Sequence, residues 1–258
     1  MMRNIIVKVL LISLSVFFAE LNDLNAQTIL NTSALMNRVD SGFVFNAEIG
    51  GDISLGNSEV MDVSGGMFAG WGSDHAMIRF IGGGNLLQEE ASVIQQGLYS
   101  QIRFNYFLNN DKSLDFFLFT QWQDNEVLLL DARFLAGGGF RCSILDKKIK
   151  VHASLGSFFE QENYALETRE LQQKHARTSL TLVAQRNSEN ITFQYSSYIQ
   201  NVIGEYKDFR FFNELTTNFH VNSKLYFSID LITRYDSQPH GGLKSFDAGL
   251  ICGLGVEL

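Results

Sequence analysis

Apolar and polar side chains alternate with a period of two along most of this sequence of 258 residues. Between Phe43 and Leu55 the odd positions are apolar or glycine, and the even positions include Asn46, Glu48 and Asp52. Successive side chains of a β-strand point to opposite faces, so the pattern predicts a strand with one apolar and one polar face. About twelve segments share it: residues 43–55, 61–71, 76–86, 98–108, 114–122, 132–144, 151–159, 176–184, 191–199, 209–221, 225–235 and 246–258.

The apolar faces of these segments carry no Asp, Glu, Lys or Arg in their central stretches. Soluble sandwiches and lipocalin-like barrels also alternate, but a broad uncharged face with aromatic residues near its edges is typical of a barrel in lipid. Aromatic residues near segment ends are Trp71, Tyr106, Trp122, Tyr195 and Tyr235. Each segment is close to the roughly 9–11 residues of a tilted membrane strand. We therefore predict an all-β fold: a closed antiparallel up-and-down transmembrane β-barrel of about twelve strands.

The composition agrees with this fold. The chain has 22 Phe and 22 Gly but one proline, Pro239, and proline is disfavoured in strands because it cannot donate to a hydrogen-bond ladder. A net charge of −8 without any run rich in Lys or Arg argues against nucleic acid as a partner.

The N-terminus resembles a secretory signal. Arg3 and Lys8 provide a positive start, and the apolar stretch 9–19 is too short to span a bilayer as a helix. Cleavage is expected between Ala26 and Gln27. This divides the chain into a signal peptide (1–26), a periplasmic lead-in (27–40) and a barrel domain (41–258) in the cell outer membrane. A buried N-terminal helix is the alternative.

The connections are predicted to alternate between tight turns and longer loops. Turn-forming residues occupy 72–74, 109–112, 146–148, 187–189 and 222–224, whereas longer stretches lie at 87–97, 125–130, 161–174, 202–207 and 237–245. Outer-membrane barrels have short periplasmic turns and longer outer loops, so the longer stretches are placed outside the cell. We expect 161–174 to be a solvated rim with room for a short helix.

The polar faces predict a lumen that contains charges of both signs. Because the two signs nearly balance, we favour a closed lumen filled by ion pairs, and a narrow passive channel for small solutes is the alternative. Inward glycines such as Gly83, Gly137 and Gly139 leave room for inward Phe117 and Phe119. The hypothetical lumen charge network consists of Glu48, Asp52, Asp62, Arg79, Arg103, Asp115, Arg133, Arg141, Arg177, Arg210, Glu214, Asp230, Arg234 and Asp247.

No residue pattern points to catalysis or a cofactor. His152 and Ser154 share the inner face of one segment, and a lipid-modifying enzyme built on this pair is the alternative to a non-enzymatic barrel. The histidines, cysteines and carboxylates lack the clustered spacing of a metal site. Cys142 and Cys252 are both predicted to face lipid on opposite sides of the barrel, too far apart to form a disulfide. The expected partners are outer-membrane lipid and the barrel assembly machinery, and the expected state is a monomer.

Several short motifs resemble the salt-induced outer-membrane protein family, a domain family of unknown function. They are Leu30-Asn31-Thr32, Arg38-Val39-Asp40-Ser41-Gly42-Phe43, Ser54-Leu55-Gly56-Asn57-Ser58, the turn at 108–111 and the segment RFLAGGGFR at 133–141. The chain looks closest to Bacteroidetes-type members of that family, and the similarity covers nearly all of the mature chain. It implies an outer-membrane barrel linked to stress, and it carries over no catalytic or binding residue. The chain departs from common barrel practice by ending in Leu258 instead of an aromatic residue.

Overall fold

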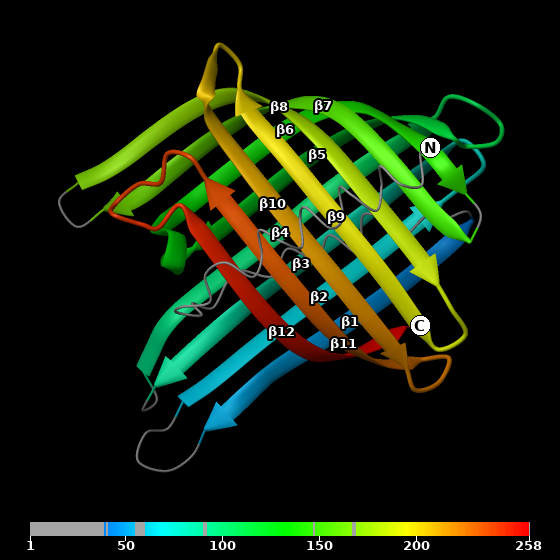
Figure 1. The fold of residues 1–258 in the computed structure, drawn as a ribbon, viewed down its shortest axis with the longest axis horizontal. Coiled ribbons are helices and arrows are strands. Elements are labelled where there is room, and N and C mark those ends of the chain that lie inside the picture. Colours follow the sequence, from blue (N-terminus) through cyan, green and yellow to red (C-terminus); the bar gives the residue numbers. More distant parts are fainter. Residues whose placement is uncertain are drawn as a thin grey trace, which may run out of the picture.

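The computed structural model describes residues 39, 41–54, 60–89, 92–146, 148–166 and 169–257. Within this part the chain forms twelve strands that wind around one lumen (Figure 1). They are β1 (Gly42–Ser54), β2 (Val60–Gly72), β3 (Ala76–Glu89), β4 (Ser92–Phe107), β5 (Leu114–Asn125), β6 (Leu130–Asp146), β7 (Ile149–Leu166), β8 (Arg169–Asn187), β9 (Ile191–Val202), β10 (Glu205–His220), β11 (Leu225–Asp236) and β12 (Phe246–Glu257). A short 3₁₀ helix, η2 (Glu126–Leu128), separates β5 from β6.

Each strand pairs antiparallel with its neighbours in the chain, and β1 pairs with β12 to close the barrel. The closing seam joins Asn46 to Glu257 and Gly50 to Gly253. Because the barrel is closed, no sheet edge is left unpaired. Strands surrounded by lipid need such closure, since lipid cannot form hydrogen bonds with an open edge. The predicted fold class, a closed antiparallel up-and-down barrel of twelve strands, is confirmed. No described helix is long and apolar enough to cross a membrane.

The two ends of the barrel differ. One end carries the connections at 73–75, 108–113, 188–190 and 221–224, and we call it the turn end. The other end carries η2 and the 237–245 loop, and we call it the loop end. The prediction of a loop at 161–174 is wrong, because residues 161–166 continue β7 and residues 169–174 belong to β8. The two strands pair from Ile149 opposite Arg186 up to Leu166 opposite Arg169. Likewise β3 and β4 take up most of 87–97, and β10 begins inside 202–207.

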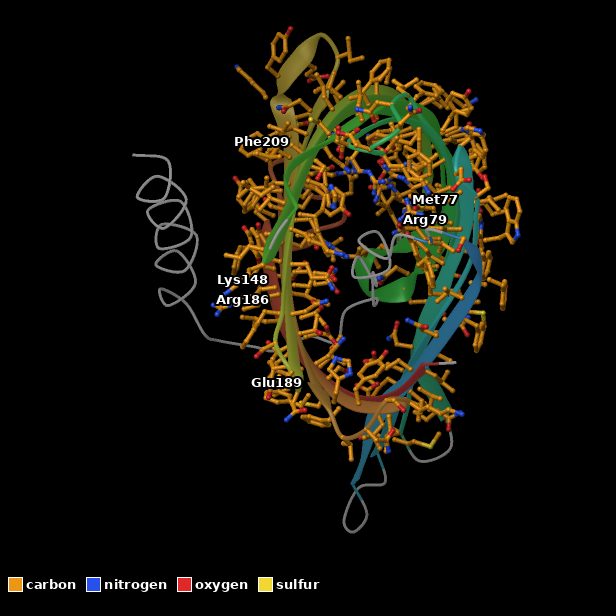
Figure 2. All side chains as sticks on the ribbon, turned by 90° about the vertical axis from the view of Figure 1, so that its right-hand side faces the viewer. Met77, Arg79, Lys148, Arg186, Glu189 and Phe209 are labelled. Carbon is orange, nitrogen blue, oxygen red and sulfur yellow. The ribbon has the colours of Figure 1, made fainter. Side chains whose placement is uncertain are left out.

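Apolar side chains cover the outside of the wall. Leu118, Leu155 and Ile49 are 49%, 63% and 63% exposed, the positions where a lipid-facing strand places its side chains. Side chains project from both faces of the wall (Figure 2), with Arg79 on the lumen side and Arg186 directed away from it. Cys142 and Cys252 are exposed on β6 and β12, and neither is in a disulfide, as the sequence predicted.

An apolar cluster fills part of the lumen beside β2, β3 and β4. It consists of Val39, Val44, Phe68, Ile81 and Tyr99. Val39 comes from the segment before β1 and is 1% exposed. It fits against Gly70 and Gly72, where an added Cβ would meet the Val39 side chain and the Val39 carbonyl oxygen. The predicted segments 1–26 and 27–40 otherwise lie outside the described residues.

Glycines on β6 and β7 make room for large rings in the same way. Phe117 lies opposite Gly139 and Phe119 opposite Gly137. A Cβ added to Gly156 would lie 3.2 Å from Cζ of Phe117. Phe119 in turn packs edge-to-face on Phe158, with 6.1 Å between the ring centroids. Inward aromatic rings and glycines therefore shape the lumen, as the sequence suggested.

Candidate functional site in the lumen

An ion-pair cluster occupies the lumen toward the loop end, and Glu160 is its centre. Glu160 lies on β7 and is completely buried. It accepts hydrogen bonds from Arg133 on β6, Arg177 on β8 and Arg210 on β10, with Nε of Arg133 at 2.6 Å and Nε of Arg177 at 2.5 Å. Charge-assisted bonds of this length are the strong ones.

Further carboxylates complete this cluster. Glu162 accepts from Nη1 of Arg210 at 2.8 Å, Asp208 pairs with Nη1 of Arg177 at 2.9 Å, and Asp236 pairs with Nε of Arg210 at 2.9 Å. We call the set Arg133, Glu160, Glu162, Arg177, Asp208, Arg210 and Asp236 the loop-end cluster. It combines three arginines with four carboxylates and joins β6, β7, β8, β10 and β11 through side chains alone.

A second group of charges lies nearer the turn end and carries an excess of arginine. Nε of Arg141 pairs with Asp115 at 2.7 Å, and Asn105 donates to the same carboxylate while accepting from Nη2 of Arg79 at 2.8 Å. Arg103 lies directly across from Arg79 in the sheet. Arg79, Arg103 and Arg141 are all buried, and Arg141 pairs directly with Asp115. We call Arg79, Arg103, Asp115 and Arg141 the basic group.

Carboxylates gather on both sides of β12, on β1 and β11. Glu48 on β1 accepts hydrogen bonds from the hydroxyls of Tyr226 and Ser228 on β11. Asp230 accepts from Oγ1 of Thr216 at 2.5 Å. Gly253 of β12 lies between these strands, and a Cβ there would lie 2.6 Å from Oε1 of Glu48. The glycine therefore provides the space into which the Glu48 side chain extends.

A cavity of about 180 Å³ lies within the lumen between the loop-end cluster and the basic group. Its wall combines aromatic rings, including Phe117, Phe158 and Tyr198, with the guanidinium groups of Arg103 and Arg234. At the loop end it is bounded by Pro239, His240 and Leu243 of the β11–β12 loop.

The β11–β12 loop is fixed to the barrel wall by His240. Its ring packs edge-to-face on Tyr164, with 4.7 Å between the centroids, and its Nε2 lies 3.0 Å from Oε1 of Gln173. Gly241 has a φ of +63°, and a side chain there would meet Leu129 and Leu166. The loop therefore needs glycine in order to lie close to the neighbouring wall.

The residues proposed from sequence for one charge network fall into separate places. Arg133, Arg177 and Arg210 meet in the loop-end cluster; Arg79, Arg103, Asp115 and Arg141 form the basic group; and Glu48, Glu214 and Asp230 lie on β1, β10 and β11. Arg234 and Asp247 are cross-strand neighbours, and Asp62 lies on β2. The side chain of Asp52 lies outside what the structure describes.

Sequence reasoning did not place Glu162, Asp208 and Asp236 in this network. Glu162 had been assigned to an outer loop, and the other two lie close to strand ends. The alternation of Glu160, Glu162 and Tyr164 was the available signal, since all three side chains are buried on one face of β7. His152 is also buried on the inner face of β7. The described residues contain no group of three or more His, Cys, Asp or Glu that could hold a metal ion.

Residues 47–258 match the family model described as a protein of unknown function, DUF481. The chain belongs to the DUF481 family. This agrees with the family resemblance seen in the sequence motifs. No curated protein sequence matches this DUF481 chain.

Solved structures resemble this DUF481 barrel in fold. The NanC porin aligns with a TM-score of 0.50 at 8% identity, covering 83% of this chain and 100% of the porin. The translocator domain of the autotransporter NalP from Neisseria meningitidis aligns with a TM-score of 0.44 at 10% identity, covering 88% of this chain and 91% of that domain. At such low identity the NanC alignment shows a shared barrel fold and nothing about ligands.

Proposed function

We propose that this protein is a non-enzymatic, structural barrel of the cell outer membrane with a closed lumen, exported through its N-terminal signal and supporting the envelope under osmotic or salt stress. Outer-membrane lipid surrounds it, the barrel assembly machinery inserts it, and it acts as a monomer. The loop end faces the outside of the cell, in keeping with the short turns at the other end.

The observation that carries this proposal is the position of Glu160. A single buried carboxylate receives arginines from β6, β8 and β10, so ion pairs link several strands on the lumen side of the wall, which supports a lumen filled by charged side chains. The Val39 cluster fills the lumen beside β2 to β4. A pore selective for one sign of charge would favour an excess of that sign along its length, whereas the loop-end cluster is nearly balanced.

Burial also gives the loop-end cluster a property suited to salt stress. Bulk salt screens exposed charges within a Debye length of about 8 Å at physiological ionic strength, but it screens buried pairs much less. Glu160 and Arg177 are 0% and 1% exposed. Side-chain links between strands that resist screening keep the barrel wall intact when the ionic strength outside the cell rises.

Conductance in planar lipid bilayers tests the closed lumen. The purified full chain, shown to be inserted by co-flotation with liposomes and by its heat-modifiable mobility on gels, is expected to give no stable single-channel steps. Stable steps from the inserted wild-type protein would overturn the proposal and favour the narrow passive channel.

Cell fractionation tests the location and the export. The mature protein is expected in the outer-membrane fraction with its N-terminus at Gln27, as read by mass spectrometry of the terminal peptide. Recovery of the full-length protein in the inner membrane would contradict export through a cleaved signal.

A further inference from the structure

The buried environment of the Arg103 side chain favours the binding of an anion. It is 9% exposed, and its guanidinium carbon lies 3.8 Å from the centroid of the Phe117 ring. Its Nε has no hydrogen-bond partner, and no carboxylate lies within ion-pair distance of it in the part of the chain that the structure describes. A buried cation without a counter-charge is costly, so a bound anion would offset a penalty that the barrel otherwise carries.

The neighbours of Arg103 increase the local positive charge. Arg79 lies directly across from it in the sheet, and Arg141 belongs to the same basic group. Asp115 is the carboxylate of this group, and Arg141 already pairs with it. Arg103 is the member of the group that lines the 180 Å³ cavity, so the excess charge acts on whatever occupies that space.

A second arginine faces the same cavity from the opposite side. Arg234 on β11 lies over the ring of Phe212 at 5.9 Å, and its Nη1 has no hydrogen-bond partner among the described residues. Asp247 is its cross-strand neighbour and reduces its pull on an anion. Arg103 therefore provides the stronger contact and Arg234 a weaker one.

The rest of the wall sets the size and character of the ligand. Phe117, Phe119, Phe158 and Phe212 bring ring faces and edges to the cavity, which suits a flat apolar body. A cavity of roughly 150 Å³ is large enough for a benzene ring, so 180 Å³ accommodates one ring with a small substituent. A planar carboxylate matches the donor fork of a guanidinium group.

We propose that the lumen cavity is a binding site for a small aromatic carboxylate, held by Arg103 at the carboxylate and by the phenylalanine rings around its body. The ligand reaches the site from the loop end, past the His240 loop. Binding is an equilibrium property of the cavity and does not depend on whether the lumen conducts.

The test uses 4-fluorobenzoate as the probe, followed by ¹⁹F NMR with the full chain folded in detergent micelles and with empty micelles as the blank. Wild type is expected to bind it saturably with a Kd at or below about 1 mM, a range reasonable for a ligand of about ten non-hydrogen atoms. The neutral analogue 4-fluorobenzamide is expected to bind about tenfold to a hundredfold more weakly, because it lacks the charge that meets Arg103.

Variants locate the site. Arg103→Gln is expected to weaken 4-fluorobenzoate binding about tenfold to a hundredfold, and Arg186→Gln, the same change on an exposed arginine outside the lumen, to leave it unchanged. Ser179→Leu keeps every charge but fills the cavity, so it is expected to abolish 4-fluorobenzoate binding. If Arg103→Gln does not fold, Ser179→Leu still tests whether the probe binds in this cavity. Equal binding of acid and amide, wild-type affinity in Arg103→Gln or in Ser179→Leu, or no saturable binding to wild type would each overturn the proposal.

Discussion

Replacing Glu160 by glutamine removes the charge at the centre of the loop-end cluster while keeping its shape. Removing one partner of a buried ion pair costs about 3–5 kcal/mol, because the other charge is left buried and unpaired. Here each arginine keeps a second carboxylate: Arg133 has Glu162 at 3.3 Å, and Arg177 has Asp208 at 2.9 Å. Arg210 keeps Glu162 as well. The change also leaves equal numbers of arginines and carboxylates. We therefore expect a loss of about 3 kcal/mol in the free energy of unfolding, the lower end of that range.

Arg177→Met gives the contrasting case. It removes the cation that serves both Glu160 and Asp208, and it leaves four carboxylates to two arginines in the cluster. Arg177 is 1% exposed, so water does not replace the lost bonds without rearrangement. We expect a loss near the upper end, about 5 kcal/mol.

Urea unfolding in lipid vesicles, followed by far-ultraviolet circular dichroism, measures both variants against wild type. Glu189→Gln, the same substitution on an exposed connection at the turn end, is the matched control and should leave the unfolding free energy unchanged. The charge-balance reasoning is refuted if Arg177→Met is no more destabilised than Glu160→Gln.

Other perturbations probe the wall, the lumen filling and the cysteines. Leu118→Arg, midway along β5 and 49% exposed, should cost about 2–4 kcal/mol in vesicles, whereas Tyr206→Arg near the loop end should cost little; equal effects would contradict a lipid-facing Leu118. Gly70→Ala places a methyl group 2.6 Å from Cγ2 of Val39 and should lower the free energy of unfolding by about 1–3 kcal/mol in the same urea assay. An unchanged free energy of unfolding would contradict the position of Val39 against Gly70. Cys142 and Cys252 should both react with maleimide in detergent without reductant, and an intact mass showing an internal disulfide would contradict the strand order.

The sequence predicted which side chains lie on the outer face of the barrel, because contact with lipid places the same requirement on all of them. Every central lipid-facing position must be apolar, so residues such as Leu118 and Leu155 mark the strands one by one. Outside the apolar band, the outward-facing side chains no longer need to be apolar. Gln161 and Asn163 lie on the outward face of β7 and are polar, so the two faces of this strand can no longer be told apart by hydropathy. This is why the prediction ended β7 too early and began β8 too late.

The lumen was less readable because its contacts depend on closure. Alternation assigns Glu160 and Arg210 to the inner face, but their contact joins residues 50 positions apart and depends on how strands β7 to β10 curve. Balanced signs in the sequence could not show that the charges separate into a nearly neutral cluster, a basic group and a carboxylate wall. The cavity also depends on how the 237–245 loop folds back over the wall. Pro239, Gly241 and Gly242 were the signal for this loop in the sequence.

The separation of charge toward the turn end has a consequence for the cavity. The basic group lies on β3, β4, β5 and β6. Asp230 lies on β11, opposite β5 in the order of strands around the barrel, and Glu48 lies on β1, between β3 and β11. Separated charges of opposite sign create a field across the lumen between the basic group and Asp230. The loop-end cluster is close to neutral and adds little to that field. An anion that enters past the His240 loop therefore meets its strongest attraction at Arg103, on the wall where Phe117 also offers a ring face. The cavity wall also contains the carboxylates of Glu162, Asp236 and Asp247, but five Arg and Lys side chains line it as well, so a cation of the same shape is disfavoured. The preference of the cavity for an anion thus follows from how barrel closure arranges the charged side chains. The total numbers of acidic and basic residues in the lumen, which nearly balance, do not show this preference.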